Sequence, residues 1–410
     1  MNKKQKIVVI VPDGMADYKM PELGNKTPME AAVKPCMDFF AKNGVCGMAE
    51  NIPDGMISDA SATANLAILG YNPRIYSKGR SPLEAASLGL VMRERDTALR
   101  CNLVTLSENE DIYEEKIVID HSADEISTED ADILVKFLDE KLGTDKIRFH
   151  TGKSYRHSLL WEDYPGECEF VGPHDILNKR AKEYLPSGEI GDYYLNLMKK
   201  SYDILNNHPL NIQRRKDGKR PANSIWLWSP GNKPQMPDFK SKYGLDGSVI
   251  AYVDLIKGLA IYAGLKTIDV EGATGNFHTN YKNKGLASIK EFENGTDFVF
   301  THIEAPDECG HRGEIENKIK SIENIDSMII KPIYDYLNAN FDEFKILVLP
   351  DHPTILATGA HSYAPVPFVL YKKGVDGKFG IDNFNEESVS GKSDIYIKDG
   401  HELMDFVLAY

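Results

Sequence analysis

The sequence predicts an α/β protein in which a mostly parallel sheet flanked by helices is interrupted by a smaller inserted α/β domain. Two strongly apolar runs, IVVIV at 7–11 and KILVLP at 345–350, indicate buried strands of the main sheet. Near-continuous apolar runs of this kind are typical of parallel strands covered on both faces. Between about residues 93 and 221 short strands no longer alternate with helices, which indicates the insert.

The first ninety residues alternate between strand and helix patterns. The run at 7–11 predicts the first strand, and the periodicity of 29–42 predicts a helix. Ser61 opens a second helical run, which Gly70 closes. Serine at position 81, followed by proline and then glutamate at 84, predicts a capping box that begins a third helix.

The insert has a different pattern of elements. An amphipathic helix over about 129–142, stopped by a glycine, is the one strong helical signal in this region. The expected strands are LRCNLVTL (99–106), KIVID (116–120), KIRFH (146–150) and YRHSLLW (155–161). The last two are separated by TGKS, which predicts a β-hairpin.

From SIWLW (224–228) onward the first pattern returns. Residues 248–265 are expected to form a helix, and about 314–338 a long amphipathic helix. The expected strands are TIDVEG (267–272), DFVFTHIEAPD (297–307) and FKILVLPD (344–351). Because both ends of the chain show the same alternation of predicted strands and helices, we expect one discontinuous domain, 1–92 with 222–410, interrupted by a domain over 93–221.

Composition excludes several classes of function. With 42% hydrophobic and 27% charged residues, the chain is expected to be soluble and globular. The net charge of −14 argues against a nucleic-acid or an anionic membrane surface as partner. Five scattered cysteines without a CxxC pair are typical of reduced thiols in the cytoplasm. The N-terminal apolar run is too short for a signal peptide.

Metal-binding residue types occur where an α/β protein places its chemistry, at strand ends and in the first turns of helices. Asp307 and His311, at spacing i and i+4, share a helix face. The full set is Asp13, Ser61, Asp307, His311, Asp351, His352 and His361. Carboxylates and imidazoles without thiolates suit two divalent cations such as Mn²⁺, Mg²⁺ or Zn²⁺. Each residue alone has an ordinary explanation as a cap or turn residue, and only their joint occurrence favours a metal site.

Ser61 has two interpretations. A serine at the start of a helix is commonly an N-cap. The same position also favours an anionic oxygen, because a helix N-terminus stabilises negative charge. In the company of metal ligands, Ser61 is therefore also a candidate nucleophile for phosphoryl transfer.

Several longer motifs carry a resemblance to a known family. They are VPDGMAD (11–17), DASATANLAILGYNP (59–73), EAPDECGH (304–311), PDHPT (350–354) and GAHS (359–362). They resemble the metal motifs of the alkaline phosphatase superfamily, and more narrowly those of cofactor-independent phosphoglycerate mutase in its archaeal-type branch. The segments at 79–89, 120–128 and 242–265 strengthen the resemblance, which covers nearly the whole chain in the same order.

The resemblance implies an alkaline-phosphatase-like fold, two metal sites and a reaction. Asp13, Ser61, Asp351 and His352 would hold one ion, and Asp307, His311 and His361 the other. Manganese is the first expectation, with magnesium or zinc as alternatives, and no 2,3-bisphosphoglycerate is needed. The enzyme would be an isomerase of glycolysis and gluconeogenesis that interconverts 3- and 2-phosphoglycerate through phosphorylated Ser61.

Other functions stay open. Part of the same branch has been proposed to phosphorylate homoserine, and NSIWLWSPG (223–231) is similar to that subset. A plain phosphomonoesterase and a non-catalytic metal or metabolite sensor are further alternatives. The protein is expected to be a monomer or a small homo-oligomer.

Substrate-binding groups are expected mainly in the insert. His121 follows a predicted strand, and Arg156 and His157 lie on the predicted hairpin. Arginine suits planar, bidentate recognition of a phosphate or carboxylate. In the main domain, Lys284 resembles a family lysine near the transferred phosphate, with Lys282 as its competitor. Arg214, in a basic loop, is a weaker candidate for the substrate carboxylate.

Overall fold

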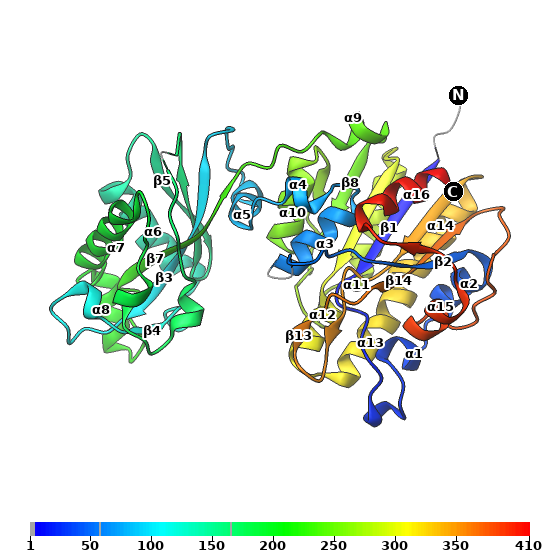
Figure 1. Cartoon of the computed structure of the whole chain (residues 1–410), viewed down its shortest axis with the longest axis horizontal. Coiled ribbons are helices and arrows are strands. Elements are labelled where there is room, and N and C mark those ends of the chain that lie inside the picture. Colours follow the sequence, from blue (N-terminus) through cyan, green and yellow to red (C-terminus); the bar gives the residue numbers. More distant parts are fainter. Residues whose placement is uncertain (1–4, 57–58, 165) are drawn as a thin grey trace. The chain divides into compact units, whose positions relative to one another are not determined.

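The computed structural model describes residues 5–56, 59–164 and 166–410 (Figure 1). The chain forms two compact units: Met1–Ser77 with Gln235–Tyr410, called unit 1, and Lys78–Pro234, called unit 2. Within the described ranges, no helix is long and apolar enough to cross a membrane.

Unit 1 is built on an eight-stranded sheet with the order β15-β2-β14-β11-β1-β10-β8-β9. All of its strands except β14 run in one direction, so the predicted mostly parallel α/β fold is confirmed. The bounds are β1 Lys6–Pro12, β2 Val45–Ala49, β8 Gly247–Ile250, β9 Lys266–Ile268, β10 Phe298–Ile303, β11 Phe344–Val348, β14 Val366–Lys372 and β15 Tyr396–Ile397.

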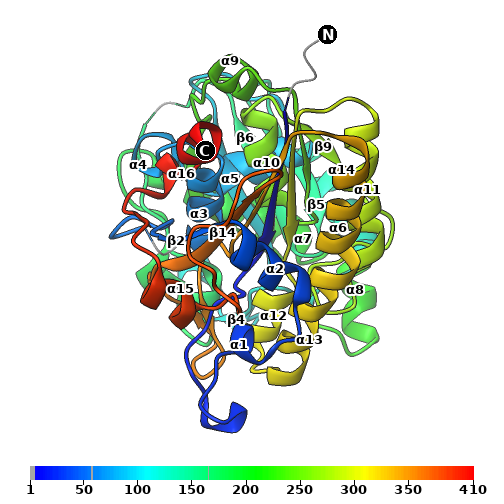
Figure 2. The ribbon, with the colours of Figure 1, turned by 90° about the vertical axis from the view of Figure 1, so that its right-hand side faces the viewer.

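Helices cover both faces of this sheet (Figure 2). On one side lie α2 (Pro35–Asn43), α11 (Tyr281–Glu293), α13 (Ile315–Ile325) and α14 (Lys331–Asn340). On the other lie α3 (Ala60–Ile68), α10 (Asp254–Tyr262) and α16 (Leu403–Ala409). The strand β1, buried along its whole length, is the centre of this sandwich, as expected for a parallel strand covered on both faces.

Two predicted helices of unit 1 are shorter than expected. The helix predicted at 29–42 is split into α1 (Pro28–Ala31) and α2, because Pro35 forces Lys34 out of the helical conformation. The segment 248–265 begins as strand β8 and becomes helical only at Asp254. A short apolar run does not distinguish a strand from a helix by periodicity, which explains the error.

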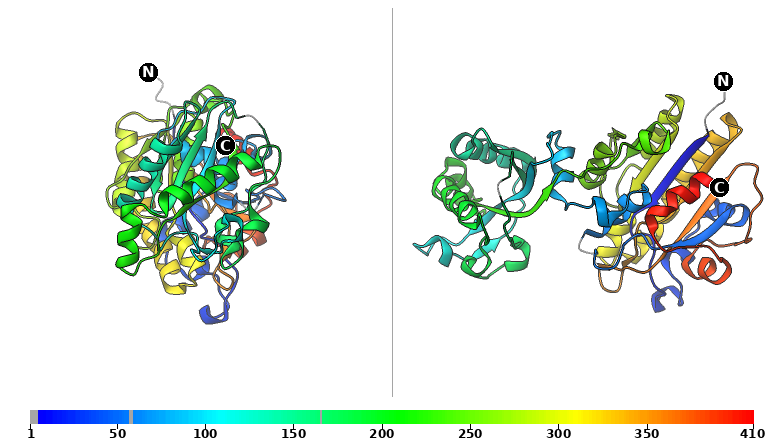
Figure 3. Two further views of the ribbon diagram at one scale, coloured as in Figure 1. Left: turned by 90° about the vertical axis from the view of Figure 1, so that its left-hand side faces the viewer. Right: turned by 45° about the horizontal axis from the view of Figure 1, so that its top comes forward.

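Unit 2 contains a five-stranded, antiparallel sheet in which β4-β3-β6-β5 lie in order and β7 also pairs with β3. The helices α6 and α7 pack on its strands (Figure 3). The bounds are β3 Thr97–Leu106, β4 Val118–Asp120, β5 Ile147–Lys153, β6 Arg156–Trp161, β7 Ser224–Asn232, α6 Thr128–Leu142, α7 Gly191–Leu205 and α8 Pro209–Lys216.

The unit boundaries lie at 77/78 and 234/235 rather than at the expected 92/93 and 221/222. Two elements cause the difference. Helix α5 (Ser81–Ser87) packs on the sheet of unit 2, where its Glu84 pairs with Arg100. The SIWLW segment forms β7, which is hydrogen-bonded to β3 and therefore completes the sheet of unit 2.

The predicted capping box of α5 is wrong. The residue preceding the helix is Arg80, and no side chain caps the helix start. The Ser81 hydroxyl instead donates to the carbonyl of Ser229 on β7. The serine thus fastens α5 to the sheet of unit 2.

Candidate functional site

The carboxyl ends of three adjacent strands in unit 1 carry the candidate site. Asp13 follows β1, Glu304 follows β10, and Asp351 lies three residues beyond β11. Because β1 pairs in parallel with both neighbours, these ends meet at one edge of the sheet. This is the edge at which open α/β sheets bind ligands.

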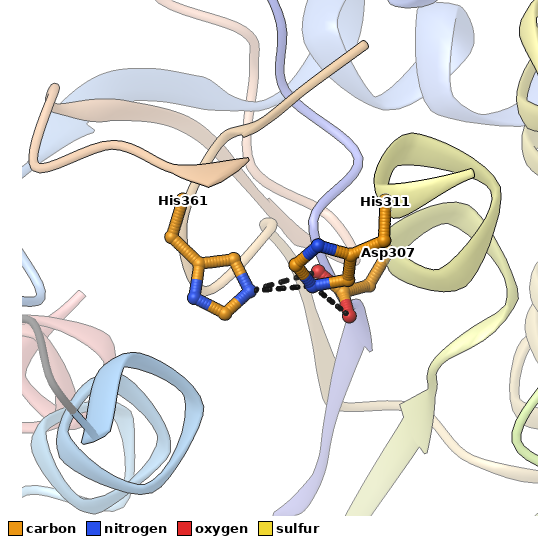
Figure 4. A group of neighbouring side chains, drawn as sticks. All are labelled: Asp307, His311 and His361. Atoms are coloured by element: carbon orange, nitrogen blue, oxygen red, sulfur yellow. Dashed lines mark hydrogen bonds and ion pairs between the residues drawn. The ribbon is translucent and has the colours of Figure 1, made fainter. Parts of the chain in front are cut away.

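One group of ligand-type side chains consists of Asp307, His311 and His361 (Figure 4). Each histidine places Nε2 3.3 Å from a different carboxylate oxygen of Asp307. The two Nε2 atoms lie 2.9 Å apart. Asp307 and His311 come from α12 (Ala305–His311), as their spacing predicted, and His361 ends the short strand β13 (Ala360–His361).

A second group surrounds Asp13. His352 Nε2 lies 3.5 Å from Asp13 and 3.6 Å from Asp351. The same nitrogen is 3.1 Å from the Ser61 hydroxyl. Asp13, Asp307 and His352 also offer ligand atoms that lie within 4.8 Å of one another, so the two groups are contiguous. The structure thus brings all seven predicted residues together.

Ser61 lies in the first turn of α3 and is not its N-cap. The capping position is Asp59, and helix α3 begins at Ala60. Asn65, one turn after Ser61, donates from its side-chain amide to the Ser61 carbonyl and to Asp351, both at 2.8 Å. Asn65 is a functional residue that sequence reasoning missed, although its i+4 spacing from Ser61 was a usable signal.

His302 is a second residue that the sequence analysis did not select. It is completely buried in β10, with Nε2 3.3 Å from Asp13. Burial lowers the pKa of His302 to about 4, so the ring is neutral and keeps a lone pair for a cation. Together with Asp13 and Asp351 it forms a third cluster of ligand-type atoms. A histidine inside an otherwise apolar strand was its only sequence signal.

The acidic groups of the site are packed closely in a buried environment. Burial raises the pKa of Asp13 well above its usual range, and the charges of Asp351 and Asp307 add to the effect. Burial also raises the pKa of Glu304 to about 7. In contrast, hydrogen bonds to His311 and His361 outweigh the effect of burial on Asp307 and leave its pKa well below the usual value.

This set of side chains fits divalent cations. Asp13 Oδ1 is buried and has no hydrogen-bond partner among the described residues. Repulsion between Asp13 and its acidic neighbours would be relieved by positive charge placed among them. The hydrogen bond to Asp307 raises the pKa of His311 to about 9, so binding of a cation there must displace a proton. The donors are oxygen and imidazole nitrogen, which suit manganese, magnesium and zinc.

Glycine at position 14 is required by the packing of the site. Its φ is +61°, and an added Cβ would lie 2.8 Å from Asp307 Oδ1. The same Cβ would also collide with the hydroxyl of Thr354, which donates to Asp307. The chain can therefore turn from Asp13 past Asp307 only without a side chain at position 14.

The two candidate lysines, Lys282 and Lys284, have different environments in the structure. Lys284 is completely buried on α11 and donates to the carbonyl of His302 at 2.9 Å, with Glu304 and Asp13 among the charges that act on it. Lys282, in the first turn of the same helix, is exposed. Of these two lysines, Lys284 is therefore the one that lies beside the ligand-type residues.

In unit 2 the structure brings together His121 and Arg156. Both flank the ring of Tyr155: the His121 ring centroid lies 5.5 Å from it, and the Arg156 guanidinium 5.4 Å. Arg156 is exposed, and the His121 side chain is one-third exposed, although its Nδ1 is buried and has no hydrogen-bond partner among the described residues. The Arg156 guanidinium and the exposed part of the His121 ring are therefore accessible to a ligand.

His157 and Arg214 are placed differently from the expectation. His157 is 4% exposed, faces the sheet side opposite to Arg156, and accepts the Gly152 N–H at Nδ1. Arg214 is also buried, and its guanidinium donates to Arg220, Asp130 and Ala123. These contacts assign both side chains to the interior of unit 2.

Comparison with known proteins gives consistent results. The family model described as 2,3-bisphosphoglycerate-independent phosphoglycerate mutase matches residues 41–211. The protein of that name from Methanosarcina barkeri is 45% identical over 93% of this chain and 94% of its own. A probable enzyme of the same name from Geobacter sulfurreducens is 42% identical over 98% of this chain and 99% of its own.

Solved structures share the fold over nearly the whole chain. A protein from Pyrococcus horikoshii has a TM-score of 0.82 at 27% identity, covering 99% of this chain and 97% of its own. The cofactor-independent phosphoglycerate mutase from Thermoplasma acidophilum has a TM-score of 0.68 at 24% identity, covering 99% of both chains. The second similarity, at this identity, concerns the fold alone.

Proposed function

We propose a residue-level mechanism from the premise that this chain belongs to the 2,3-bisphosphoglycerate-independent phosphoglycerate mutase family. The enzyme is an isomerase that interconverts 3-phosphoglycerate and 2-phosphoglycerate. The proposal concerns the phosphorylated intermediate, the cations and the substrate contacts. The observation that carries it is the position of the Ser61 hydroxyl, 3.1 Å from His352 and in the first turn of α3.

Ser61 acts as the nucleophile in this mechanism. Its hydroxyl loses a proton, its oxygen forms a bond to phosphorus while the bond from phosphorus to the 3-oxygen of the substrate breaks, and the released glycerate oxygen takes up a proton. In the second half, the 2-hydroxyl loses its proton and attacks phosphorylated Ser61, and the serine oxygen leaves and takes up a proton. The N–H groups of the first turn of α3 face the phosphoryl group in both halves and favour its negative charge.

Asp13, Ser61, Asp351 and His352 would hold one divalent cation, and Asp307, His311 and His361 would hold the other. When bound, these cations lower the pKa of the serine hydroxyl and neutralise charge on the phosphoryl oxygens. We favour manganese, with magnesium and zinc as alternatives that the same carboxylate and imidazole donors also suit. Asn65 fixes the position of Asp351 relative to the Ser61 backbone through its two hydrogen bonds.

The substrate is a small molecule with two anionic groups, so it requires cationic partners. We assign Arg156 and His121 of unit 2 to this role, because both side chains are at least partly exposed and an arginine guanidinium pairs with phosphate or carboxylate. We assign Lys284 of unit 1 to the charge balance of the site, since its ammonium group is buried close to Glu304. His157 is left as a support of the unit 2 sheet.

The cellular setting follows from the cysteines. All five are free, and four of them are buried. Unpaired cysteines are typical of reducing compartments. We therefore place the enzyme in the cytoplasm.

The proposed cation requirement is tested with metal-stripped protein. Formation of 2-phosphoglycerate from 3-phosphoglycerate is followed by coupling to enolase, with no 2,3-bisphosphoglycerate present. We expect turnover to appear on addition of Mn²⁺ and to be lost with excess chelator. Full turnover in excess chelator would show that the reaction does not require the cations.

A further inference from the structure

A buried ion pair lies behind the candidate metal site and is not part of it. Lys318, on α13, is 0% exposed, and Asp17, four residues after Asp13, is 5% exposed. The Lys318 ammonium donates to the Asp17 carboxylate at 2.8 Å. Neither residue belongs to the groups of ligand-type side chains found in the described part of the chain.

The remaining donors of Lys318 connect two segments of the site. The ammonium donates to the carbonyl of Thr354 at 2.6 Å and lies 3.4 Å from the carbonyl of Ala16. Ala16 belongs to the segment that follows Asp13, and Thr354 belongs to the segment that follows His352. One ammonium group therefore holds both segments, and an ammonium has no more than three hydrogens to donate.

Asp17 connects the same segments from the other side. Its carboxylate accepts the N–H of Leu356 at 3.1 Å and that of Tyr18 at 2.8 Å. Its own N–H donates to Glu386 at 3.0 Å, which ties the segment to α15 (Glu386–Lys392). The buried carboxylate thus accepts hydrogen bonds from one ammonium and two backbone N–H groups at its two oxygens, so the segment has one well-defined position.

Thr354 connects the Lys318–Asp17 ion pair to the metal-ligand residues. In the short strand pair β12–β13, with β12 at Thr354–Ile355, Thr354 lies opposite His361. The Thr354 hydroxyl donates to Asp307 and lies 3.3 Å from His352 Nδ1. A shift of the Thr354 backbone would thus displace groups that contact three ligands of the two candidate cations.

We propose that Lys318 and Asp17 form a positioning pair that holds the metal-ligand segments in place before cations bind, and thereby sets the affinity for Mn²⁺. This inference rests on the proposed function, because it takes the two cation sites from it. Burying a charge is unfavourable unless it is paired, so such a pair is retained where it fixes one arrangement of the chain. Groups that orient metal ligands commonly change metal affinity by about 10- to 100-fold when they are removed.

The test uses the full chain with Lys318→Met, which keeps the length of the side chain and removes its charge and donors. Mn²⁺ is titrated by calorimetry into metal-stripped protein, and free Mn²⁺ is measured by electron paramagnetic resonance. We expect the dissociation constant for Mn²⁺ to rise about tenfold. Turnover lost at low Mn²⁺ should be recovered at saturating Mn²⁺, which a general loss of folding would not permit.

The matched control is Lys345→Met. Lys345 is also buried, at 2% exposed, and donates to the carbonyls of Val407 and Leu408 near the opposite end of β11. This control should lower the unfolding temperature without changing the affinity for Mn²⁺. An affinity of Lys318→Met within twofold of wild type would show that the pair is merely structural and would overturn the proposal.

A second variant keeps the proposal testable if Lys318→Met does not fold. Asp17→Asn retains an oxygen for the N–H of Leu356, and it removes the charge and one of the two acceptor oxygens. It should also weaken Mn²⁺ binding, and an unchanged dissociation constant would contradict the proposal. If the wild-type protein bound no Mn²⁺, both the proposed function and this inference would fail. If the wild-type protein bound Mn²⁺ and both variants had the same dissociation constant as wild type, only the inference about the positioning pair would be refuted.

Discussion

At the scale of single residues, the proposed reactivity of the Ser61 hydroxyl depends on the side chains that surround it. Ser61 lies beside His352, and the helix that carries it is tied to Asp351 through Asn65. Neither contact involves an unusual residue type. Reactivity at this position is therefore a property of the cluster, and substitutions that leave Ser61 in place but disturb Asn65 should also impair it.

His157 allows a residue-scale prediction about pH. Burial lowers the pKa of His157 to about 3, from a usual value of 6.5. The folded state therefore binds this proton less readily than the unfolded state, and stability is complete above pH 6.5 and falls as the pH drops toward 3. Protonation would place a hydrogen on Nδ1, where the Gly152 N–H is now accepted. Between pH 7 and pH 5 this one group should remove about 2 kcal/mol.

Tryptophan fluorescence in urea measures this effect, because all three tryptophans (Trp161, Trp226 and Trp228) belong to unit 2. The loss of unfolding free energy between pH 7 and pH 5 should be about 2 kcal/mol smaller in His157→Gln than in wild type. The exposed His174→Gln is the matched control. Equal pH dependence in His157→Gln and wild type would show that His157 is not buried in its neutral form.

At the scale of elements, the parts of the site that lie next to strong local patterns could be predicted from the sequence. Asp13 and the Asp351–His352 pair directly follow apolar runs of the sequence, and Asp307 and His311 share a helix face. These relations are local and so are visible along the chain. Their meeting at one sheet edge follows from parallel pairing, which the apolar runs also indicate.

Other features could not be predicted, because they depend on long-range pairing. β7 has the apolar alternation of any half-buried strand, and only its hydrogen bonds to β3 assign it to unit 2. His302 lies beside Asp13 because its partner in the β1–β10 pairing is Val11, two residues before Asp13. This pairing places its ring among the ligand-type side chains. The positioning pair at Lys318 joins residues about three hundred positions apart, which no local pattern encodes.

One helix end gives an element-scale prediction. Helix α2 has no capping side chain of its own, and the buried carboxylate of Asp326 accepts the N–H groups of Cys36 and Met37 at 3.1 and 2.7 Å. Asp326 begins a π-helical turn (Asp326–Ile330) that joins α13 to α14. Asp326→Ala should therefore destabilise unit 1 by about 2 kcal/mol, the upper range for loss of a helix cap.

Calorimetric unfolding provides the measurement for Asp326→Ala. The transition of unit 1 should move to lower temperature, while the tryptophan fluorescence transition of unit 2 stays unchanged. Ser327→Ala, at the exposed neighbouring position, controls for the turn itself. A loss no larger than that of Ser327→Ala would show that Asp326 does not cap α2.

At the scale of the whole molecule, the chain is two units with separate hydrophobic cores. The core of unit 1 lies between its sheet and α2, α11, α13 and α14, and that of unit 2 lies between its sheet and helices α6 and α7. The two ends of unit 2 are adjacent, since a Cβ added to Gly231 would collide with the carbonyl of Lys78. Adjacent termini and an independent core are what an inserted domain needs in order to fold alone.

We therefore expect a fragment spanning Lys78–Pro234 to fold independently. Its tryptophan fluorescence should show one cooperative transition in urea, at a midpoint close to that of unit 2 in the full chain. A fragment spanning the originally expected boundaries, 93–221, lacks α5 and β7 and serves as the comparison. If the longer fragment showed no cooperative transition, unit 2 would not be an independent folding unit.

The central claim is that the mutase reaction proceeds through phosphorylated Ser61. The most direct measurement is rapid quenching of the Mn²⁺-loaded enzyme with 3-phosphoglycerate, followed by peptide mass spectrometry of residues 59–73. We expect one added phosphoryl group on Ser61 in the wild-type enzyme, and neither this group nor turnover in Ser61→Ala. A turnover-competent Ser61→Ala, or a phosphoryl group found only on a histidine, would contradict this claim.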